Sequence, residues 1–270
     1  MKGRVALIAG RGALPAIVAR ELDRPLVAAL DGFLPEGLTA DIVFRVERLV
    51  PFLNHLSLAG VDRVVFAGAV QRPRLDPSLF DAATAQLVPQ LLAAMQGGDD
   101  AALRGVIAIF EEAEFAVVGV DAVAPGLVPG PGVLCGSVTE ADERDATRAA
   151  EIVAALGAVD VGQGAVVAQG LCLGVEALPG TDAMLDFVAA TGATLRPDPG
   201  GARGLLYKAA KPGQDRRVDL PALGPMTVAR AAAAGLGGIA WEAGSVILLD
   251  RGATIAAAQA AGLFLWARGR

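Results

Sequence analysis

A segment rich in proline and glycine interrupts this chain of 270 residues and limits how the chain can fold. Residues 124–136 hold three prolines and four glycines in thirteen positions. Proline removes a backbone donor and breaks helices and central strands, and glycine weakens both. We therefore expect neither element there, and we place a boundary between two domains, residues 1–130 and residues 131–270.

The first domain alternates short apolar runs with longer stretches that favour helix. Its hydrophobic content comes from Ala, Val and Leu, and aromatic residues are only 4% of the chain, which is typical of helices packed on buried strands. Strands separated by helices predict a mostly parallel sheet covered by helices, here a Rossmann-like one. Strands are expected over 4–10, 25–30, 41–46, 63–68 and 116–120, and helices over 16–22, 49–59, 79–95 and 101–113.

The second domain continues the same pattern and predicts another α/β domain. A helix is expected over 140–156, strand-like runs over 165–168 and 172–175, and a helix from residue 182. A loop over 196–203, a strand over 204–208 and a last α/β stretch over 227–265 follow.

Composition and charge argue against several classes of protein. The net charge is −6, and no cluster of Lys and Arg interleaved with aromatic residues occurs, so we expect no nucleic-acid partner. Cys135 and Cys172 give no disulfide framework, and the first residues lack the apolar length of a signal peptide. Pro, Gly and Gln break the uncharged runs 122–139 and 161–175, so we expect no transmembrane helix and a cytoplasmic location.

The turn after the first predicted strand resembles part of a dinucleotide-binding fingerprint. Gly10 and Gly12 supply half of G-x-G-x-x-G, but Pro15 stands at the third glycine position, where its ring would crowd the contact between helix and sheet. Nicotinamide binding is therefore disfavoured. Loop amides at a helix start still bind phosphate or pyrophosphate, and a tight turn without a ligand is the alternative.

The scarcity of histidine narrows the chemistry further. His55 is the single histidine and lies in an apolar predicted helix, where a packing or surface role is favoured. Zinc hydrolases, metallophosphatases with His and Asp ligands, and Ser/His/Asp hydrolases need histidines that this chain lacks. A catalytic metal would have carboxylate, carbonyl and water ligands, which indicates Mg²⁺ or Mn²⁺.

Two polar regions follow predicted strands in the second domain, the position where α/β proteins place their sites. Residues 207–224 alternate cations and carboxylates among prolines and glycines, and a solvated loop would have a similar composition. The second region, residues 175–184, also ends a strand. There Thr181 or Asp182 could simply cap the following helix.

These residues resemble the LpxI-type UDP-2,3-diacylglucosamine pyrophosphatases of Gram-negative lipid A biosynthesis over nearly the whole chain. In the first domain the shared motifs are Ile8-Ala9-Gly10-x-Gly12-Ala13-Leu14-Pro15, Val65-Phe66-Ala67-Gly68-x-Val70-x-Arg72-Pro73 and Gly98-Asp99-Asp100. In the second they are Asp160-Val161-Gly162-Gln163, Gly180-Thr181-Asp182-Ala183-Met184, Lys211-Pro212-x-Gln214-Asp215-x-Arg217-Val218-Asp219-Leu220-Pro221, Ala234-Gly235-Leu236-x-Gly238-Ile239 and Glu242-Ala243-Gly244.

The resemblance implies Mg²⁺-dependent hydrolysis of UDP-2,3-diacylglucosamine to lipid X (2,3-diacylglucosamine 1-phosphate) and UMP, with water attack on the phosphorus nearer the sugar. It implies two α/β domains with a cleft between them that encloses the lipid. The family's essential aspartate maps to Asp219, as catalytic residue and metal ligand. Substrate-binding positions carried over are Gly10, Gly12, Ala13, Leu14, Pro15, Gly68, Arg72, Gln163, Thr181, Asp182, Lys208, Lys211 and Gln214.

Several points stay open at this stage. Glu176, Asp182 or Asp215 would complete the metal shell or act as general base, and Pro179 stands where the family usually has an acidic residue. The expected partner is the acylated UDP-sugar, and peripheral contact with the inner membrane and a homodimer are both left open. The alternative functions are a nucleotide-sugar or dinucleotide-dependent enzyme and a non-catalytic lipid-binding protein.

Overall fold

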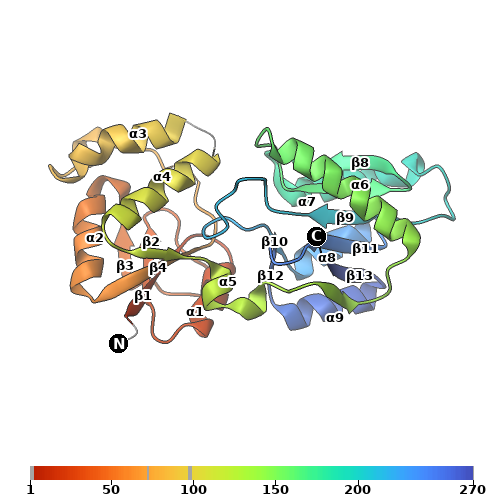
Figure 1. Ribbon diagram of the computed structural model, residues 1–270, viewed down its shortest axis with the longest axis horizontal. Helices are drawn as coiled ribbons and strands as arrows, with labels where there is room; N and C mark the ends of the chain where they lie inside the picture. The colour runs from red at the N-terminus through yellow and green to blue at the C-terminus, as the bar shows by residue number, and fades with distance from the viewer. Residues whose placement is uncertain (1–2, 72, 97–98, 270) are drawn as a thin grey trace. The chain divides into compact units, whose positions relative to one another are not determined.

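The computed structural model describes residues 3–71, 73–96 and 99–269 (Figure 1). The chain forms two compact units, residues 1–125 and 126–270, and each is treated by itself. The division falls within the segment rich in Pro and Gly. No helix among the described residues combines the length and the apolar character that a membrane crossing needs.

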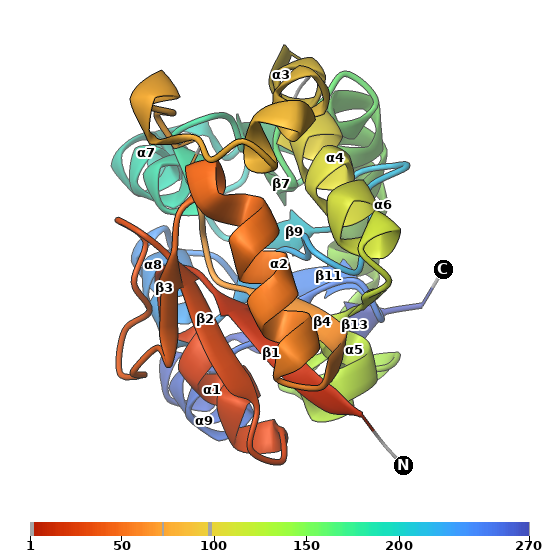
Figure 2. The ribbon, with the colours of Figure 1, turned by 90° about the vertical axis from the view of Figure 1, so that its left-hand side faces the viewer.

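The first unit is built on a parallel sheet of five strands in the order β3-β2-β1-β4-β5. From β1 the chain adds β2 and β3 on one side and then β4 and β5 on the other, which is the strand order of doubly wound sheets. Figure 2 faces this unit and shows β1, β2 and β3 beside one another. The strands are β1 (Arg4–Ala9), β2 (Leu26–Leu30), β3 (Ile42–Phe44), β4 (Val61–Ala67) and β5 (Ala116–Val118). The helices are α1 (Leu14–Glu21), α2 (Leu49–Leu58), α3 (Val88–Gln96), α4 (Asp99–Glu112) and α5 (Val120–Val123).

Aromatic side chains of two helices pack against one face of this sheet. Phe52 of α2 stacks on Phe44 of β3 with ring centroids 4.0 Å apart. Phe110 of α4 meets Phe52 at 6.4 Å and Phe66 of β4 at 5.2 Å, both edge to face. Such pairs add to the stability that burial already provides. Helices α2 and α4 therefore cover the same face.

The expected helix over 79–95 is shorter in the structure and begins at Val88. Pro89 suits a first helical turn because its missing N–H has no helical acceptor there. Before it, the Asp81 carboxylate accepts hydrogen bonds from the amides of Ala83 and Thr84, which favours short 3₁₀ turns over a continuous helix.

The second unit has a mixed sheet in the order β6-β13-β11-β9-β7-β8. Its strands are β6 (Gly132–Cys135), β7 (Gly164–Ala168), β8 (Leu171–Val175), β9 (Leu205–Lys208), β11 (Gly238–Glu242) and β13 (Phe264–Arg268). A separate parallel pair joins β10 (Ala222–Leu223) to β12 (Ile247–Leu248). The helices are α6 (Glu140–Gly157), α7 (Gly180–Leu195), α8 (Pro225–Ala233) and α9 (Arg251–Ala261).

Helices cover both faces of this sheet. On one face Ala146, Ala149 and Val153 of α6 pack on Leu205 and Tyr207 of β9. On the other, apolar side chains of α7, α8 and α9 form the larger core with Leu206 and Trp241. Fully buried strands covered on both faces explain the continuous apolar runs of the sequence. The chain is thus an α/β protein with a parallel sheet and a second, mixed sheet.

One strand lies where none was expected. β6 falls inside the segment rich in Pro and Gly and pairs antiparallel with β13 at the edge of the sheet. Proline is tolerated beside an edge strand because only one side of that strand needs hydrogen bonds. The prolines at 125, 129 and 131 all precede this four-residue strand.

Candidate active site

Strand register brings the polar residues of the second unit to one edge of its sheet. Lys208 ends β9, and Trp241, beside it in register, lies one residue before the end of β11. β7 runs antiparallel to β9, so its first residue, Gly164, pairs with Lys208. β8 returns antiparallel to β7 and ends next to Gly164, where the amide of Glu176 donates to the Gly164 carbonyl at 2.8 Å. Binding sites in α/β sheets lie at such carboxyl ends.

Lys208 is the buried cation of this edge. The Lys208 residue is 5% exposed, and its Nζ donates to Thr181 Oγ1 at 2.6 Å. The same Nζ lies 3.4 Å from Glu176 Oε2, to which the Thr181 hydroxyl donates at 2.8 Å. A strand end, a helix start and the loop between β8 and α7 thus supply one connected group.

The loop after β9 carries Asp219 and is held by Gln214, which is buried. The Gln214 Oε1 accepts a hydrogen bond from the Lys211 amide at 2.8 Å, and its Nε2 donates to Asp219 Oδ2. Lys211 reaches back across the sheet edge, because its Nζ pairs with Asp160 Oδ1 at 2.6 Å. Gln214 therefore fixes the position of the Asp219 carboxylate relative to the first turn of the loop.

Two arginines of the same loop also pair with carboxylates. Arg217 donates from Nε and Nη2 to the Asp215 carboxylate, with distances of 2.9 Å to Oδ1 and 2.7 Å to Oδ2. Arg216 Nη2 lies 3.0 Å from Oε2 of Glu242, the last residue of β11. The pairing of Arg216 with Glu242 ties the loop to the neighbouring strand.

Gln163 directly precedes β7, and its backbone contacts the residue that follows β9. Its carbonyl accepts a hydrogen bond from the Ala209 amide at 3.1 Å. Its Oε1 is buried and has no hydrogen-bond partner among the residues that the structure describes. A buried acceptor without a donor is costly, so this oxygen is suited to a donor from a ligand or a water molecule.

Asp182 has a partner outside this group. Its Oδ2 lies 3.3 Å from Nε of Arg230 on α8, and Arg230 also pairs with Asp186. The side chain is exposed and links α7 to α8. This pairing gives Asp182 a structural role, and its predicted contact with substrate stays a prediction.

The residues of this edge fit a magnesium ion only in part. Within the described ranges, no three His, Cys, Asp or Glu side chains converge as a ligand set. Mg²⁺ is usually held by one or two carboxylates, with substrate phosphates and water completing its shell. The Asp219 carboxylate suits that arrangement, whereas a cage built from protein ligands alone does not form.

In the first unit, Gly10 and Gly68 lie at the carboxyl ends of adjacent strands β1 and β4. Arg11 and Ala69 exchange two backbone hydrogen bonds of 2.9 and 3.0 Å, and the Gly10 amide donates to Ala67 at 2.8 Å. A Cβ on Gly10 would lie 2.6 Å from the Ala69 carbonyl oxygen. The contact between the two loops therefore requires glycine at both positions, whether or not a ligand binds.

The rest of the predicted N-terminal loop leads into α1. Gly12 has φ +92° with open space where a Cβ would lie, Ala13 is the N-cap residue, and Leu14 and Pro15 begin the helix. Because the amides of Gly10 and Arg11 are used, an anion here would depend on the amides of residues 12–14. Arg72 lies outside the described residues.

The structure brings many of the predicted site residues together, and their roles in binding and catalysis stay predictions. The structure brings Gln163, Thr181, Lys208, Lys211, Gln214 and Asp219 to one edge of the second sheet, and Gly10, Gly12, Ala13, Leu14, Pro15 and Gly68 to one end of the first. Asp160 and Glu242 were not among the predicted site residues. Both begin motifs shared with the family, Asp160-Val161-Gly162-Gln163 and Glu242-Ala243-Gly244, and these motifs were the available signal.

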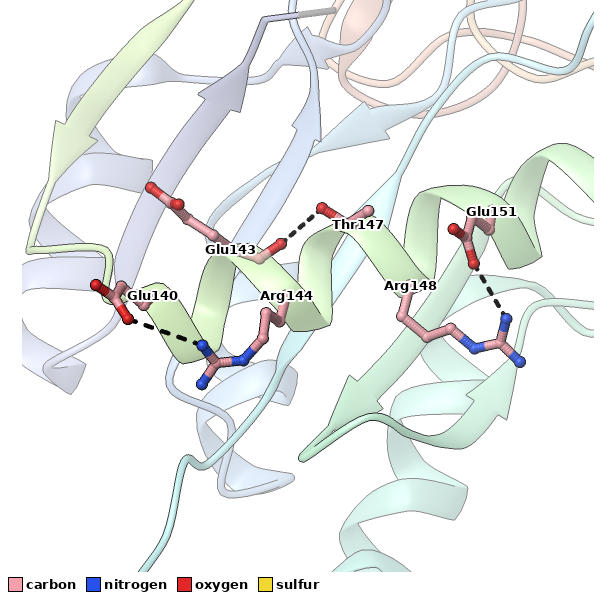
Figure 3. A pocket seen from close by; sticks show the side chains of 6 residues that line it. All are labelled: Glu140, Glu143, Arg144, Thr147, Arg148 and Glu151. Carbon is pink, nitrogen blue, oxygen red and sulfur yellow. Dashed lines mark hydrogen bonds and ion pairs between the residues drawn. The ribbon is translucent and has the colours of Figure 1, made fainter.

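A hollow on the exposed side of α6 is unrelated to this edge (Figure 3). Its lining is charged, but the charges pair along the helix. Arg144 lies 3.8 Å from Glu140, and Arg148 lies 3.1 Å from Glu151. Pairs three or four residues apart are normal on a solvated helix face. A second hollow lies at the amino ends of β9, β11 and β13, opposite Lys208.

Comparisons with known proteins agree over nearly the whole chain. The family model for the LpxI N-terminal domain matches residues 4–127, and that for the LpxI C-terminal domain matches residues 130–266. The chain is 40% identical to the UDP-2,3-diacylglucosamine pyrophosphatase LpxI of Caulobacter vibrioides over 272 aligned positions. That alignment covers 97% of this chain and 96% of the relative.

Proposed function

The chain belongs to the LpxI family, and from this we propose that it hydrolyses the pyrophosphate of UDP-2,3-diacylglucosamine in lipid A biosynthesis. The products would be UMP and lipid X. The relative from Caulobacter vibrioides carries the name of this activity and aligns with nearly the full chain. The polar edge that holds Lys208 and Asp219 is the observation on which the proposed site depends.

The charges of this edge support a phosphate-bearing substrate. Among the side chains described there, four cations face five carboxylates. The cations are Lys208, Lys211, Arg216 and Arg217, and the carboxylates are Asp160, Glu176, Asp215, Asp219 and Glu242. Fixed cations stabilise charge on phosphate oxygens, and phosphoryl transfer depends mainly on such positioning and electrostatics.

This charge balance also supports the need for a divalent cation. The cations at the edge do not outnumber the carboxylates, and a pyrophosphate would add further negative charge. We propose that Asp219 holds Mg²⁺ together with substrate phosphate oxygens and water. When bound, the ion would neutralise charge on the non-bridging oxygens and polarise the phosphorus that is attacked.

The chain's own residues would position the substrate. Lys208, at the end of β9, and Lys211, in the loop that follows, would provide fixed positive charge. Gln214 holds the Asp219 carboxylate, and Oε1 of Gln163, for which the described part of the chain supplies no donor, is suited to a donor group of the ligand. Contact of the Gly12–Pro15 loop with the nucleotide or sugar phosphate remains part of the proposal.

One experiment tests this proposal directly. Purified protein is incubated with UDP-2,3-diacylglucosamine in H₂¹⁸O with Mg²⁺ or with EDTA, and the products are identified by mass spectrometry. Release of UMP and lipid X is expected only with Mg²⁺, with the label in lipid X if water attacks the phosphorus nearer the sugar. Substrate that stays intact with Mg²⁺ present would contradict the proposed reaction, and equal turnover in EDTA would contradict the metal.

The role of Asp219 is tested by Asp219→Asn and Asp219→Ala. Both variants should lose turnover but keep much of the substrate affinity, because acyl and uridine contacts are remote from the reacting phosphorus. Asp23→Asn is the matched control, since the Asp23 side chain is 92% exposed. An Asp219→Ala protein with a turnover rate within tenfold of the control would contradict the assignment of Asp219 as catalytic residue and metal ligand.

A further inference from the structure

Glu176 is a carboxylate that lies beside the buried Lys208 ammonium. It follows β8, and its carboxylate lies between the Lys208 ammonium and the Thr181 hydroxyl. A carboxylate that contacts a buried cation and a hydroxyl bound by the same cation has the contacts of a counterion. Its surroundings therefore favour this role over that of a metal ligand or a general base.

The backbone around Glu176 leaves its carboxylate little room. A Cβ on Gly164 would lie 2.7 Å from Glu176 Oε2. A Cβ on Gly162 would lie 1.9 Å from the Glu176 carbonyl oxygen, and Gly162 has φ +60°. Two glycines of the β7 start therefore allow the Glu176 segment to approach closely, and the approach sets where the carboxylate can lie.

The hydrogen bonds of the group assign each proton. Thr181 Oγ1 donates to Glu176 Oε2 at 2.8 Å and accepts from Lys208 Nζ at 2.6 Å. A lysine ammonium has three N–H groups and no acceptor. One is used by Thr181 and one faces Glu176, so the third is directed by these two contacts and is suited to a phosphate oxygen.

We propose that Glu176 is a positioning residue that orients the Lys208 ammonium toward a substrate phosphate through the shared Thr181 hydroxyl. It compensates the buried charge of Lys208 and is neither metal ligand nor general base. This inference rests on the proposed function for the identity of the phosphate. Its physical basis is preorganisation, in which a donor is held in place by surrounding hydrogen bonds before the substrate arrives.

Two substitutions at this position separate the possible roles. Glu176→Gln keeps an oxygen that can accept from Thr181 and Lys208 but cannot take up a proton, while Glu176→Ala removes both contacts. We expect Glu176→Ala to lower kcat/KM about 100-fold, the effect of misplacing a catalytic donor by about 1 Å. Glu176→Gln should recover activity to within about tenfold of the wild type, since a neutral hydrogen bond replaces a charge-assisted one.

Each other role predicts a different result. A general base or metal ligand would leave Glu176→Gln as inactive as Glu176→Ala, and this result would overturn the proposal. A purely structural role would lower the melting temperature of both variants but leave kcat/KM unchanged, which would also overturn it. If Glu176→Ala does not fold, Thr181→Val removes the shared hydroxyl and should lower kcat/KM in the same direction.

The lysines allow a readout that does not depend on turnover. The chain has only Lys2, Lys208 and Lys211, so protein labelled with [¹³Cε]lysine gives three side-chain signals. Inorganic pyrophosphate should shift the Lys208 signal in the wild type and in Glu176→Gln, and at the same concentration less in Glu176→Ala. The Lys2 signal is the internal control.

The two readouts distinguish failure of this inference from failure of the proposed function. A Lys208 signal that responds to pyrophosphate equally in the wild type and in Glu176→Ala would overturn the positioning role. A wild-type protein that binds pyrophosphate at Lys208 but releases no UMP from UDP-2,3-diacylglucosamine would overturn the proposed reaction and leave the role of Glu176 standing.

Discussion

Replacing Gly10 with alanine places a methyl group between two backbone segments that already touch. The added Cβ would lie 2.6 Å from the Ala69 carbonyl oxygen and 2.8 Å from the Gly68 carbonyl carbon. Both are backbone atoms, and the Arg11–Ala69 hydrogen bonds of 2.9 and 3.0 Å restrain them. Relief requires a backbone shift, so we expect Gly10→Ala to lower the free energy of unfolding by about 1–3 kcal/mol.

Two neighbouring glycines provide matched controls for this clash. Gly12 has φ +92°, and no atom lies within 4 Å of the position that a Cβ would take, so Gly12→Ala tests backbone conformation alone and should cost about 1–2 kcal/mol. Gly68 combines φ +94° with a Cβ position 2.7 Å from the Gly10 carbonyl carbon. Gly68→Ala should therefore be the most destabilising of the three, at about 2–5 kcal/mol.

The assay must report the first unit specifically. Both tryptophans, Trp241 and Trp266, and the single tyrosine lie in the second unit, so intrinsic fluorescence follows that unit. Urea unfolding followed by far-ultraviolet circular dichroism gives the free energy, and hydrogen exchange of peptides 4–9 and 61–67 localises the loss. Wild-type protection of these peptides in Gly10→Ala would refute the clash argument.

Three further outcomes follow from contacts in the structure. Gln214→Ala should lower kcat and cost about 1–3 kcal/mol of stability, because the Asp219 carboxylate loses a buried partner; unchanged kinetics would contradict this. Burial raises the pKa of the Cys135 thiol while Cys172 is exposed, so maleimide mass mapping should label Cys172 first, and equal rates would contradict this. A hydrogen bond from the Thr84 side chain lowers the pKa of Asp81 below 3.8. The ionised Asp81 carboxylate therefore stabilises the fold above pH 3.8, and this contribution is lost as the pH falls through the lowered pKa. In urea unfolding, the stability difference between the wild type and Asp81→Asn should shrink over that fall in pH, and a difference that does not change with pH would contradict this.

The parallel sheet of the first unit was predictable because each buried strand is followed by a helix, and such crossovers require parallel neighbours. The mixed sheet of the second unit had a signal in the sequence that the analysis did not use. Only Gln169 and Gly170 connect β7 to β8, with φ +53° and +79°. A two-residue connection with positive φ is a hairpin turn, and a hairpin is antiparallel.

The half-motif around Gly10 illustrates how one pattern can have two physical causes. A dinucleotide fingerprint needs glycine so that the backbone can approach a pyrophosphate. Here the structure gives Gly10 a different requirement, the approach of Gly68 and Ala69 at the end of β4. That partner is 58 residues away in sequence, so spacing alone could not separate the two explanations.

The family resemblance supplied the predicted site residues, and polar loops after strands were the pattern in the sequence that agreed with it, but the partners of these residues depended on strand order. Lys208 meets Thr181 and Glu176 because β9 pairs with β7, β7 pairs with β8, and α7 begins directly after β8. Without the antiparallel hairpin, Glu176 would lie at the opposite end of the sheet, since a parallel β8 would carry its end away from Gly164. The hairpin that the sequence analysis did not recognise is therefore the element that places a carboxylate beside the buried lysine.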